Sequence, residues 1–154
     1  MFRLNRLTDY AVVVMSQMAH RNEKVRTALQ ISQESGLPLP TVAKLLNALA
    51  RDGLITSQRG ASGGYALSRP AGEISVAAII QALEGPIALT ACVSGSDDHC
   101  EVASVCPMHG NWNKVNGAIR EALDAVTLAD MSMTPLDYRE LPAAPKQEAS
   151  AATG

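Results

Sequence analysis

Residues 40–68 read PTVAKLLNALARDGLITSQRGASGGYALS, and this stretch decides the fold that we expect. Its first half carries an apolar stripe at helical spacing, formed by Val42, Leu45, Leu46 and Leu49. Pro40 suits the first turn of a helix, where its missing N–H leaves no hydrogen bond unmade, and Gly53 is a typical stop. The pattern therefore predicts a helix over residues 40–52 with one buried and one exposed face.

A glycine-rich loop follows this helix. Two runs of β-prone residues, 54–59 and 65–67, lie on either side of the segment GASGG at 60–64. Such a pattern is typical of a β-hairpin. A nucleotide-binding loop is a weaker interpretation, because no lysine closes the glycine run and no strand-to-helix transition surrounds it. The sequence predicts a hairpin over residues 54–68, placed as a wing beside the helix.

A shorter helix is expected upstream, over residues 28–35, with Thr27 as N-cap and Gly36 as C-terminal stop. Helix, tight turn and helix form a helix-turn-helix, whose second helix docks in the DNA major groove, although helical hairpins without a DNA role are common. The candidate DNA contacts are Thr41, Lys44, Asn47, Ala48 and Arg51 on the helix, and Arg59, Gly60, Ser62, Gly63, Gly64 and Tyr65 on the wing. Arginine side chains and glycine N–H groups can meet phosphate oxygens there.

The charge of the chain is divided unevenly. Residues 1–70 hold nine basic and four acidic side chains, a net charge of +5, and the remainder carries −7. A basic first half fits contact with a polyanion, although a charged segment is often only a solvated face. The start of the chain is polar and its apolar run at 10–15 is too short to span a bilayer. We expect a cytoplasmic protein with no membrane contact.

Three further segments are predicted around this unit. The first is a helix over about residues 7–19, and the second is a helix from the cap Ser75 through Leu83, so that residues 1–84 form a winged helix-turn-helix domain. After a loop at 85–110, apolar residues at alternating +3 and +4 spacing predict a long helix over 111–131, and a second copy of the chain is its natural partner. Residues 141–154 have the composition of a disordered tail.

All three cysteines lie in the loop, as Cys92, Cys100 and Cys106, with His109 close behind. Three thiols and an imidazole within 18 residues suit a four-coordinate site for a soft metal or an iron-sulfur cluster. The spacing lacks the paired C-x2-C knuckles of zinc ribbons, so a zinc-stabilised interaction domain is the second interpretation. Unconnected thiols are a third. No orienting acid or oxyanion loop accompanies the Cys–His pair, so we expect neither an enzyme nor a small-molecule substrate.

The sequence resembles the winged-helix iron-sulfur regulators of the IscR and NsrR type over about residues 2–131. The resemblance rests on LTDYA at 7–11, RGASGGYAL at 59–67, and the stretch from EISVA at 73–77 to ALEGP at 82–86. EGPIALT at 84–90 and VTLADM at 126–131 are most similar to regulators of the SUF assembly system. The resemblance implies a homodimer that binds double-stranded operator DNA and controls, as a repressor, genes of iron-sulfur cluster assembly. A nitric-oxide-sensing repressor of the NsrR type is the alternative.

The ligand set that the resemblance implies is transferred residue by residue. Cys92, Cys100 and Cys106 match the family's three cysteines, although the first interval is longer than in IscR. His109 matches the histidine that completes a 2Fe-2S site, and Asp9 matches the carboxylate that NsrR-like proteins supply to a 4Fe-4S cluster. His99 is a weaker third choice. The 2Fe-2S cluster with His109 is the favoured expectation, and a 4Fe-4S cluster is the alternative.

Overall fold

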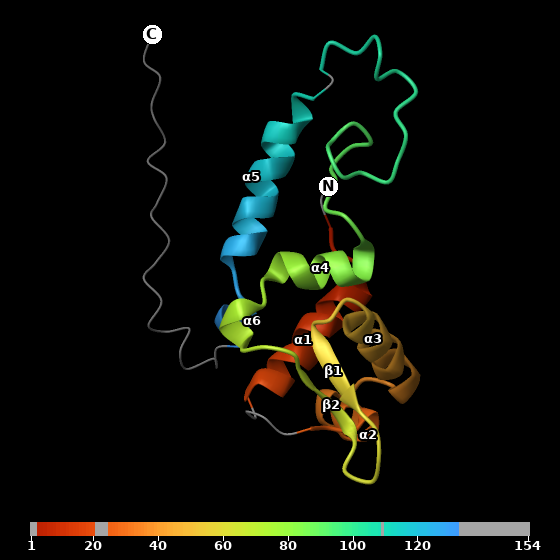
Figure 1. The fold of residues 1–154 in the computed structure, drawn as a ribbon, viewed down its shortest axis with the longest axis vertical. Coiled ribbons are helices and arrows are strands. Elements are labelled where there is room, and N and C mark those ends of the chain that lie inside the picture. Colours follow the sequence, from red (N-terminus) through yellow and green to blue (C-terminus); the bar gives the residue numbers. More distant parts are fainter. Residues whose placement is uncertain (1–2, 21–24, 109, 133–154) are drawn as a thin grey trace.

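The computed structural model describes residues 3–20, 25–108 and 110–132 of the 154-residue chain. Its elements are α1 (Arg6–His20), α2 (Ala28–Ser35), α3 (Leu39–Arg51), β1 (Ile55–Gln58), β2 (Gly64–Leu67), the short 3-10 helix η1 (Ala71–Glu73), α4 (Val76–Glu84), α5 (Trp112–Ala125) and α6 (Leu128–Met131). The two strands pair as one antiparallel hairpin, whose loop forms the lower end of the molecule in Figure 1. The expected fold class, mainly helical with a small β-hairpin wing, is confirmed.

Helix α2 begins and ends where the sequence predicts. The Thr27 hydroxyl accepts a hydrogen bond from the N–H of Gln30 at 3.2 Å, and the Gln30 side chain accepts one from the N–H of Thr27 at 2.9 Å. This reciprocal pair satisfies two N–H groups that a helix start otherwise leaves unpaired. Gly36 ends the helix with φ +72°, a left-handed conformation that glycine adopts without steric cost.

Helix α3 starts and stops one residue earlier than the predicted range of 40–52. Pro38 occupies the N-cap position and Asp52 the C-cap position, so the helix itself spans Leu39–Arg51. Gly53 follows with φ +72° and turns the chain toward β1. The predicted apolar stripe is fully buried, and its four members are Val42, Leu45, Leu46 and Leu49.

One hydrophobic core joins α1, α3, α4 and the base of the wing. Its fully buried members include Val14 and Met15 of α1, Ile79 of α4 and Ile55 of β1. Each such side chain contributes about 1.5–3 kcal/mol by leaving water. Leu128 of α6 is also fully buried in this core. The winged-helix core therefore needs a residue from beyond the predicted domain range of 1–84.

The wing has a third, one-residue strand. Ile55 pairs with Leu67 and Gln58 with Gly64 in the hairpin itself. On the other edge of β2, the Arg26 N–H donates to the Tyr65 carbonyl at 2.9 Å, and the Tyr65 N–H donates to the Arg26 carbonyl at 2.7 Å. The buried Arg26 guanidinium also pairs with Glu34 of α2. These contacts fix the wing to the helix-turn-helix.

The expected single helix over 111–131 is wrong, because the chain forms two helices there. Helix α5 ends at Ala125 and Val126 takes an extended conformation. The N–H of Val76 donates to the Val126 carbonyl at 2.8 Å, and the N–H of Leu128 donates to the Ile74 carbonyl at 2.7 Å. This short antiparallel pairing draws the chain back to the start of α4 and interrupts the helix.

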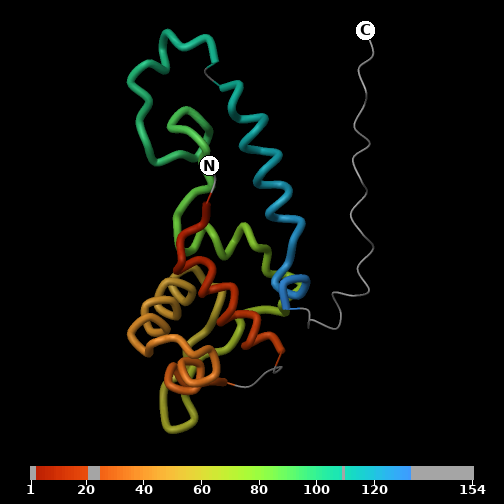
Figure 2. The backbone as a smooth tube through the Cα atoms, turned by 180° about the vertical axis from the view of Figure 1, so that it is seen from behind, coloured from red at the N-terminus to blue at the C-terminus, as the bar shows by residue number. Residues whose placement is uncertain are grey.

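Helix α5 rises away from the core beside the irregular segment that connects it to α4 (Figure 2). Its Ile119 and Leu123 pack on a small apolar cluster formed by Val76, Ala77, Ile80 and Ile87. Within the described residues, no helix has both the length and the apolar character needed to cross a membrane. The predicted tail at 141–154 lies outside the described residues.

Candidate nucleic-acid interface and cysteine loop

The exposed face of α3 carries the polar residues predicted to contact DNA. Lys44, Asn47 and Arg51 are exposed, whereas Thr41 and Ala48 are half-buried at the edges of this face. Arg51 pairs with the adjacent Asp52 at 3.3 Å, a surface contact that contributes little to stability. Because the opposite side of α3 is fully buried, the helix presents only this face outward.

The wing tip places Arg59, Gly60 and Ser62 in solvent. Gly63 differs from expectation, because its N–H donates to the Gly60 carbonyl at 3.0 Å and is not free for a phosphate. A Cβ at Gly63 would lie 2.4 Å from the Gln58 carbonyl oxygen, so the turn needs a glycine there for steric reasons. The glycine run thus shapes the tip that presents Arg59.

Tyr65 lies within strand β2, opposite Ser57, rather than in the loop at the wing tip. Its side chain is half-buried against the winged-helix core, and its backbone makes both hydrogen bonds with Arg26. The structure therefore gives Tyr65 a role in holding the wing in place. A direct DNA contact from Tyr65 stays a prediction.

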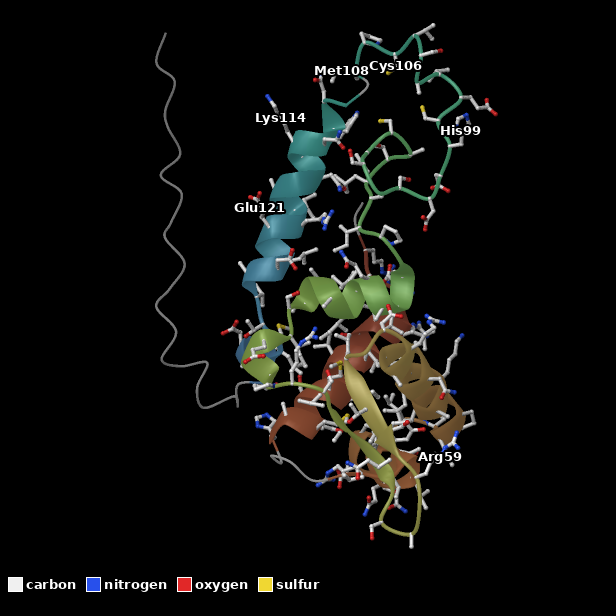
Figure 3. The ribbon with its side chains drawn as sticks, viewed as in Figure 1. Arg59, His99, Cys106, Met108, Lys114 and Glu121 are labelled. Atoms are coloured by element: carbon white, nitrogen blue, oxygen red, sulfur yellow. The ribbon has the colours of Figure 1, made fainter. Side chains whose placement is uncertain are left out.

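The cysteine loop lies at the opposite end of the molecule from the wing. Figure 3 shows Cys106 and Met108 near one end of the long axis, His99 on the same loop, and Arg59 near the other end. All three cysteines are half-buried thiols without a disulfide partner. Helices α4 and α1 therefore lie between this loop and the wing (Figure 1).

Two of the three thiols face one hollow of about 310 Å³. Cys92, His99 and Cys100 line this hollow, whereas Cys106 does not. Among the described residues, no group of three or more His, Cys, Asp and Glu side chains is gathered closely enough to hold a metal ion. His109 lies outside the described residues. The structure thus brings part of the predicted ligand set together.

Asp9 is placed apart from the cysteines within the chain. It is exposed in the first turn of α1, where a carboxylate interacts favourably with the helix dipole. It lines a different hollow, with Arg3, Leu4, Asn5 and Arg6. Asp9 as a cluster ligand stays a prediction.

A hydrogen-bond network joins the start of α1 to the end of α4. The hydroxyl of Thr8, which is fully buried, donates to Glu84 Oε1 at 2.5 Å. The N–H of Asn5 donates to the same carboxylate oxygen at 3.0 Å. Glu84 is the last residue of α4 before the cysteine loop. This network fixes the point at which the loop leaves the domain.

Two asparagines of α5 contact the cysteine loop but were not predicted from the sequence as site residues. Asn113 and Asn116 accept hydrogen bonds from the backbone of the cysteine loop, at Ser94 and Leu89 respectively. Three-residue spacing places both on one side of the helix. Their sign in the sequence is a polar residue on the side of the helix that packs against the rest of the protein. A search for apolar spacing alone does not detect such a residue.

Comparison with known proteins identifies the family. A family model described as "Iron-dependent Transcriptional regulator" matches residues 4–134. The chain belongs to the Rrf2 family. It is 32% identical over 130 residues to the HTH-type transcriptional regulator IscR of Serratia proteamaculans, covering 84% of this chain and 78% of that protein. Rrf2 members are transcriptional regulators, so the chain is a DNA-binding regulator and not an enzyme.

Two solved structures of Rrf2-type regulators share the fold. CymR, described as the global cysteine regulator of B. subtilis, is 30% identical with a TM-score of 0.64, covering 86% of this chain and 97% of that one. IscR of T. potens is 32% identical with a TM-score of 0.60, covering 99% and 94%. The chain therefore shares its winged-helix architecture with both of these regulators.

Proposed function

We propose that the chain is a cytoplasmic, homodimeric repressor that binds operator DNA and reads the state of an iron-sulfur cluster on its cysteine loop. Its targets are genes of iron-sulfur cluster assembly of the SUF type. The observation that carries this proposal is a loop with three unpaired thiols, two of them facing one hollow, attached to an Rrf2 winged helix.

DNA binding follows from the two exposed basic surfaces. Lys44, Asn47 and Arg51 on α3 are placed to read base edges in the major groove. Arg59 at the wing tip neutralises a backbone phosphate and so contributes affinity without sequence preference. Two copies related by a twofold axis would read two half-sites of a palindromic operator.

A second copy of the chain is the proposed partner for the exposed face of α5. Trp112 and Val115 of α5 are 40% and 46% exposed, although each is large and apolar, and Val126, just after the helix, is 37% exposed. Burying such side chains in water-free contact is favourable, and a twofold interface lets one stripe cover the other. Ile119, the apolar residue four positions after Val115, already packs on α4.

The chemistry of the loop fits an iron-sulfur cluster, since thiolates are the ligands that such clusters require. Cys92, Cys100 and Cys106 would hold it. His109 is the favoured fourth ligand and Asp9 the alternative, with a 2Fe-2S cluster favoured over a 4Fe-4S cluster. A bound cluster supplies a state that changes with iron supply and redox conditions.

Hydrogen bonds connect both ends of the loop and α5 region to α4. The loop leaves α4 at Glu84, which the buried Thr8 hydroxyl holds, and the chain returns to the start of α4 through Val126. Ser75, the cap of α4, also donates to Asp124 of α5 at 2.9 Å. A change in the loop therefore acts on both ends of α4, which packs on α3. In a dimer, this would set the spacing of the two α3 helices.

Anaerobic purification of the full chain tests the proposal. The expected result is a coloured protein that contains iron and acid-labile sulfide in equal amounts, as both a 2Fe-2S and a 4Fe-4S cluster require. In gel-shift assays with the DNA upstream of its own gene, binding by the wild type should change with cluster state. Cys92→Ser should abolish that change, and Ser104→Ala, in the same loop, should keep it.

Three outcomes would overturn the proposal or part of it. A colourless, iron-free preparation whose zinc content matched the protein would replace the cluster with a structural zinc site. If Cys92→Ser bound DNA like the wild type under every redox condition, the loop would not be a regulatory switch. Sedimentation of the purified protein as a monomer would remove the second copy from the scheme.

A further inference from the structure

The first half of the cysteine loop is fastened to α5. Within α5, Asn116 alone is buried, at 4% exposure. Its Nδ2 donates to the Ile87 carbonyl at 2.9 Å, and its Oδ1 accepts from the N–H of Leu89 at 3.0 Å. One turn earlier, Asn113 Oδ1 accepts from the N–H of Ser94 at 2.8 Å. Three side-chain hydrogen bonds thus hold residues 87–94 along the helix.

The second half of the loop has no comparable attachment among the described residues. The backbone bonds there join Ser96 to Val93, Ala103 to Cys100, Val105 to Val102 and Asn111 to Met108, each three positions apart. Val102 and Val105 are 56% and 79% exposed, so neither packs on the protein. The described part of 96–108 is therefore held mainly by local turns.

This division separates the cysteines. Cys92 belongs to the fastened half, next to Val93, which is buried at 4% exposure. The Thr90 hydroxyl also lies 3.2 Å from Cys92 Sγ, within hydrogen-bond reach. Cys100 and Cys106 belong to the half held by local turns. The segments that carry the three thiols are thus held to the rest of the protein to different extents.

We propose that Asn113 and Asn116 are positioning residues that fix Cys92 before any cluster binds. Cys92 is then the preformed ligand, Cys100 adjusts within the hollow that it already shares with Cys92, and Cys106 moves to them from outside this hollow. The inference rests on the proposed function for the identity of the bound group. A buried amide side chain suits this task because the irregular backbone of 87–94 has N–H and C=O groups that need partners. A leucine at 116 would leave them unpaired.

The first test uses the full-length apo protein and needs no cluster. Amide hydrogen exchange should be slower at Leu89 and Ser94 than across residues 96–108. Replacing Asn113 with Ala should speed exchange at Ser94 by about tenfold, the effect of one lost hydrogen bond. Asn116→Ala should do the same at Leu89. Asn111→Ala is the matched control, because Asn111 is exposed and makes no hydrogen bond to residues 87–94 among those described.

Thiol reactivity gives a second readout in the same apo protein. Iodoacetamide should alkylate Cys92 more slowly than Cys100 in the wild type. Asn113→Ala should raise the rate at Cys92 and leave the rate at Cys100 unchanged. A merely structural defect would instead speed exchange in α1 and α4 as well. If Asn116→Ala does not fold, Asn113→Ala decides the matter, since Asn113 is exposed.

Titration with cobalt(II) alone tests whether the positioning of Cys92 by Asn113 affects metal binding. Its thiolate absorption should appear at lower metal concentration in the wild type than in Asn113→Ala, with Asn111→Ala matching the wild type. Equal exchange across 87–94 and 96–108 in the wild type would overturn the inference, as would an unchanged Cys92 rate in Asn113→Ala. If the exchange pattern holds but anaerobic protein carries no iron or sulfide, the proposed function fails and the positioning role stands.

Discussion

Replacing Gly64 with alanine should detach the wing from the helix-turn-helix. Gly64 has φ +154°, and a Cβ there would lie 2.4 Å from the Arg26 carbonyl oxygen and 2.6 Å from its carbonyl carbon. Both atoms are backbone, so neither can move aside as a flexible side chain would. The Arg26 backbone must shift, and the two hydrogen bonds that it makes with Tyr65 are the contacts at risk.

The expected loss follows from those two bonds. At about 1 kcal/mol each, Gly64→Ala should lower the free energy of unfolding by about 2 kcal/mol. The displaced wing should also weaken operator binding by about tenfold, equivalent to about 1.4 kcal/mol of lost contact. Urea unfolding with linear extrapolation measures the first value, and fluorescence anisotropy with operator DNA measures the second.

Gly72→Ala is the matched control for this change. Its Cβ would meet nothing within 4 Å, so the substitution should stay within about 0.5 kcal/mol of the wild type. The steric reasoning is refuted if Gly64→Ala and Gly72→Ala have the same stability and the same affinity for DNA.

Three further outcomes are expected. Arg59→Ala should weaken binding to all DNA sequences and reduce the slope of log affinity against log salt by about 0.9, with Arg120→Ala on α5 as control; an unchanged slope would count against the wing contact. Leu128→Ala should lower the free energy of unfolding by about 3 kcal/mol in urea titrations, because this side chain is fully buried; a loss near zero would mean that α6 does not complete the core. Hydrogen bonds from the Thr127 N–H and hydroxyl hold the pKa of Asp130 below its ordinary value of 3.8. The ionised carboxylate therefore stabilises the fold above that value, so Asp130→Ala should be less stable than the wild type near neutral pH and equal to it in acid; a pH-independent difference would contradict this.

The elements that local chemistry specifies could be predicted from the sequence. Thr27 and Gly36 bound α2 as expected, and the buried stripe of α3 matches its spacing. The wing followed from glycines between β-prone runs. In each case the deciding residues lie within a few positions of one another, so their pattern carries the information.

Features that depend on distant backbone could not be predicted in the same way. The break between α5 and α6 comes from pairing of Val126 and Leu128 with a segment about fifty residues earlier. The apolar spacing continues through this break and gives no sign of it. Likewise, the partners of Asn116 are backbone groups of an irregular loop, and no side-chain pattern announces them.

The candidate site was predicted in its chemistry more than in its arrangement. The three thiols are unpaired, as the proposal of a cluster requires, but only Cys92 and Cys100 line one hollow with His99. Spacing along the sequence shows which residues are available as ligands. It does not show whether the fold brings all of them to one place. The exposed face of α3 could be predicted more directly, because a helix that buries one side in the core exposes the opposite side.

The return of the chain at Val126 has a consequence for synthesis. Leu128 completes a core whose other members lie before Leu83, so the cysteine loop and α5 form an insertion within the DNA-binding domain. A ribosome must therefore synthesise the cysteine loop and α5 before Leu128 can complete the core of the DNA-binding domain. No nascent chain would therefore hold a complete DNA-binding core without an already synthesised cysteine loop, and a fragment ending at residue 84 would lack the Leu128 side chain that fills this core.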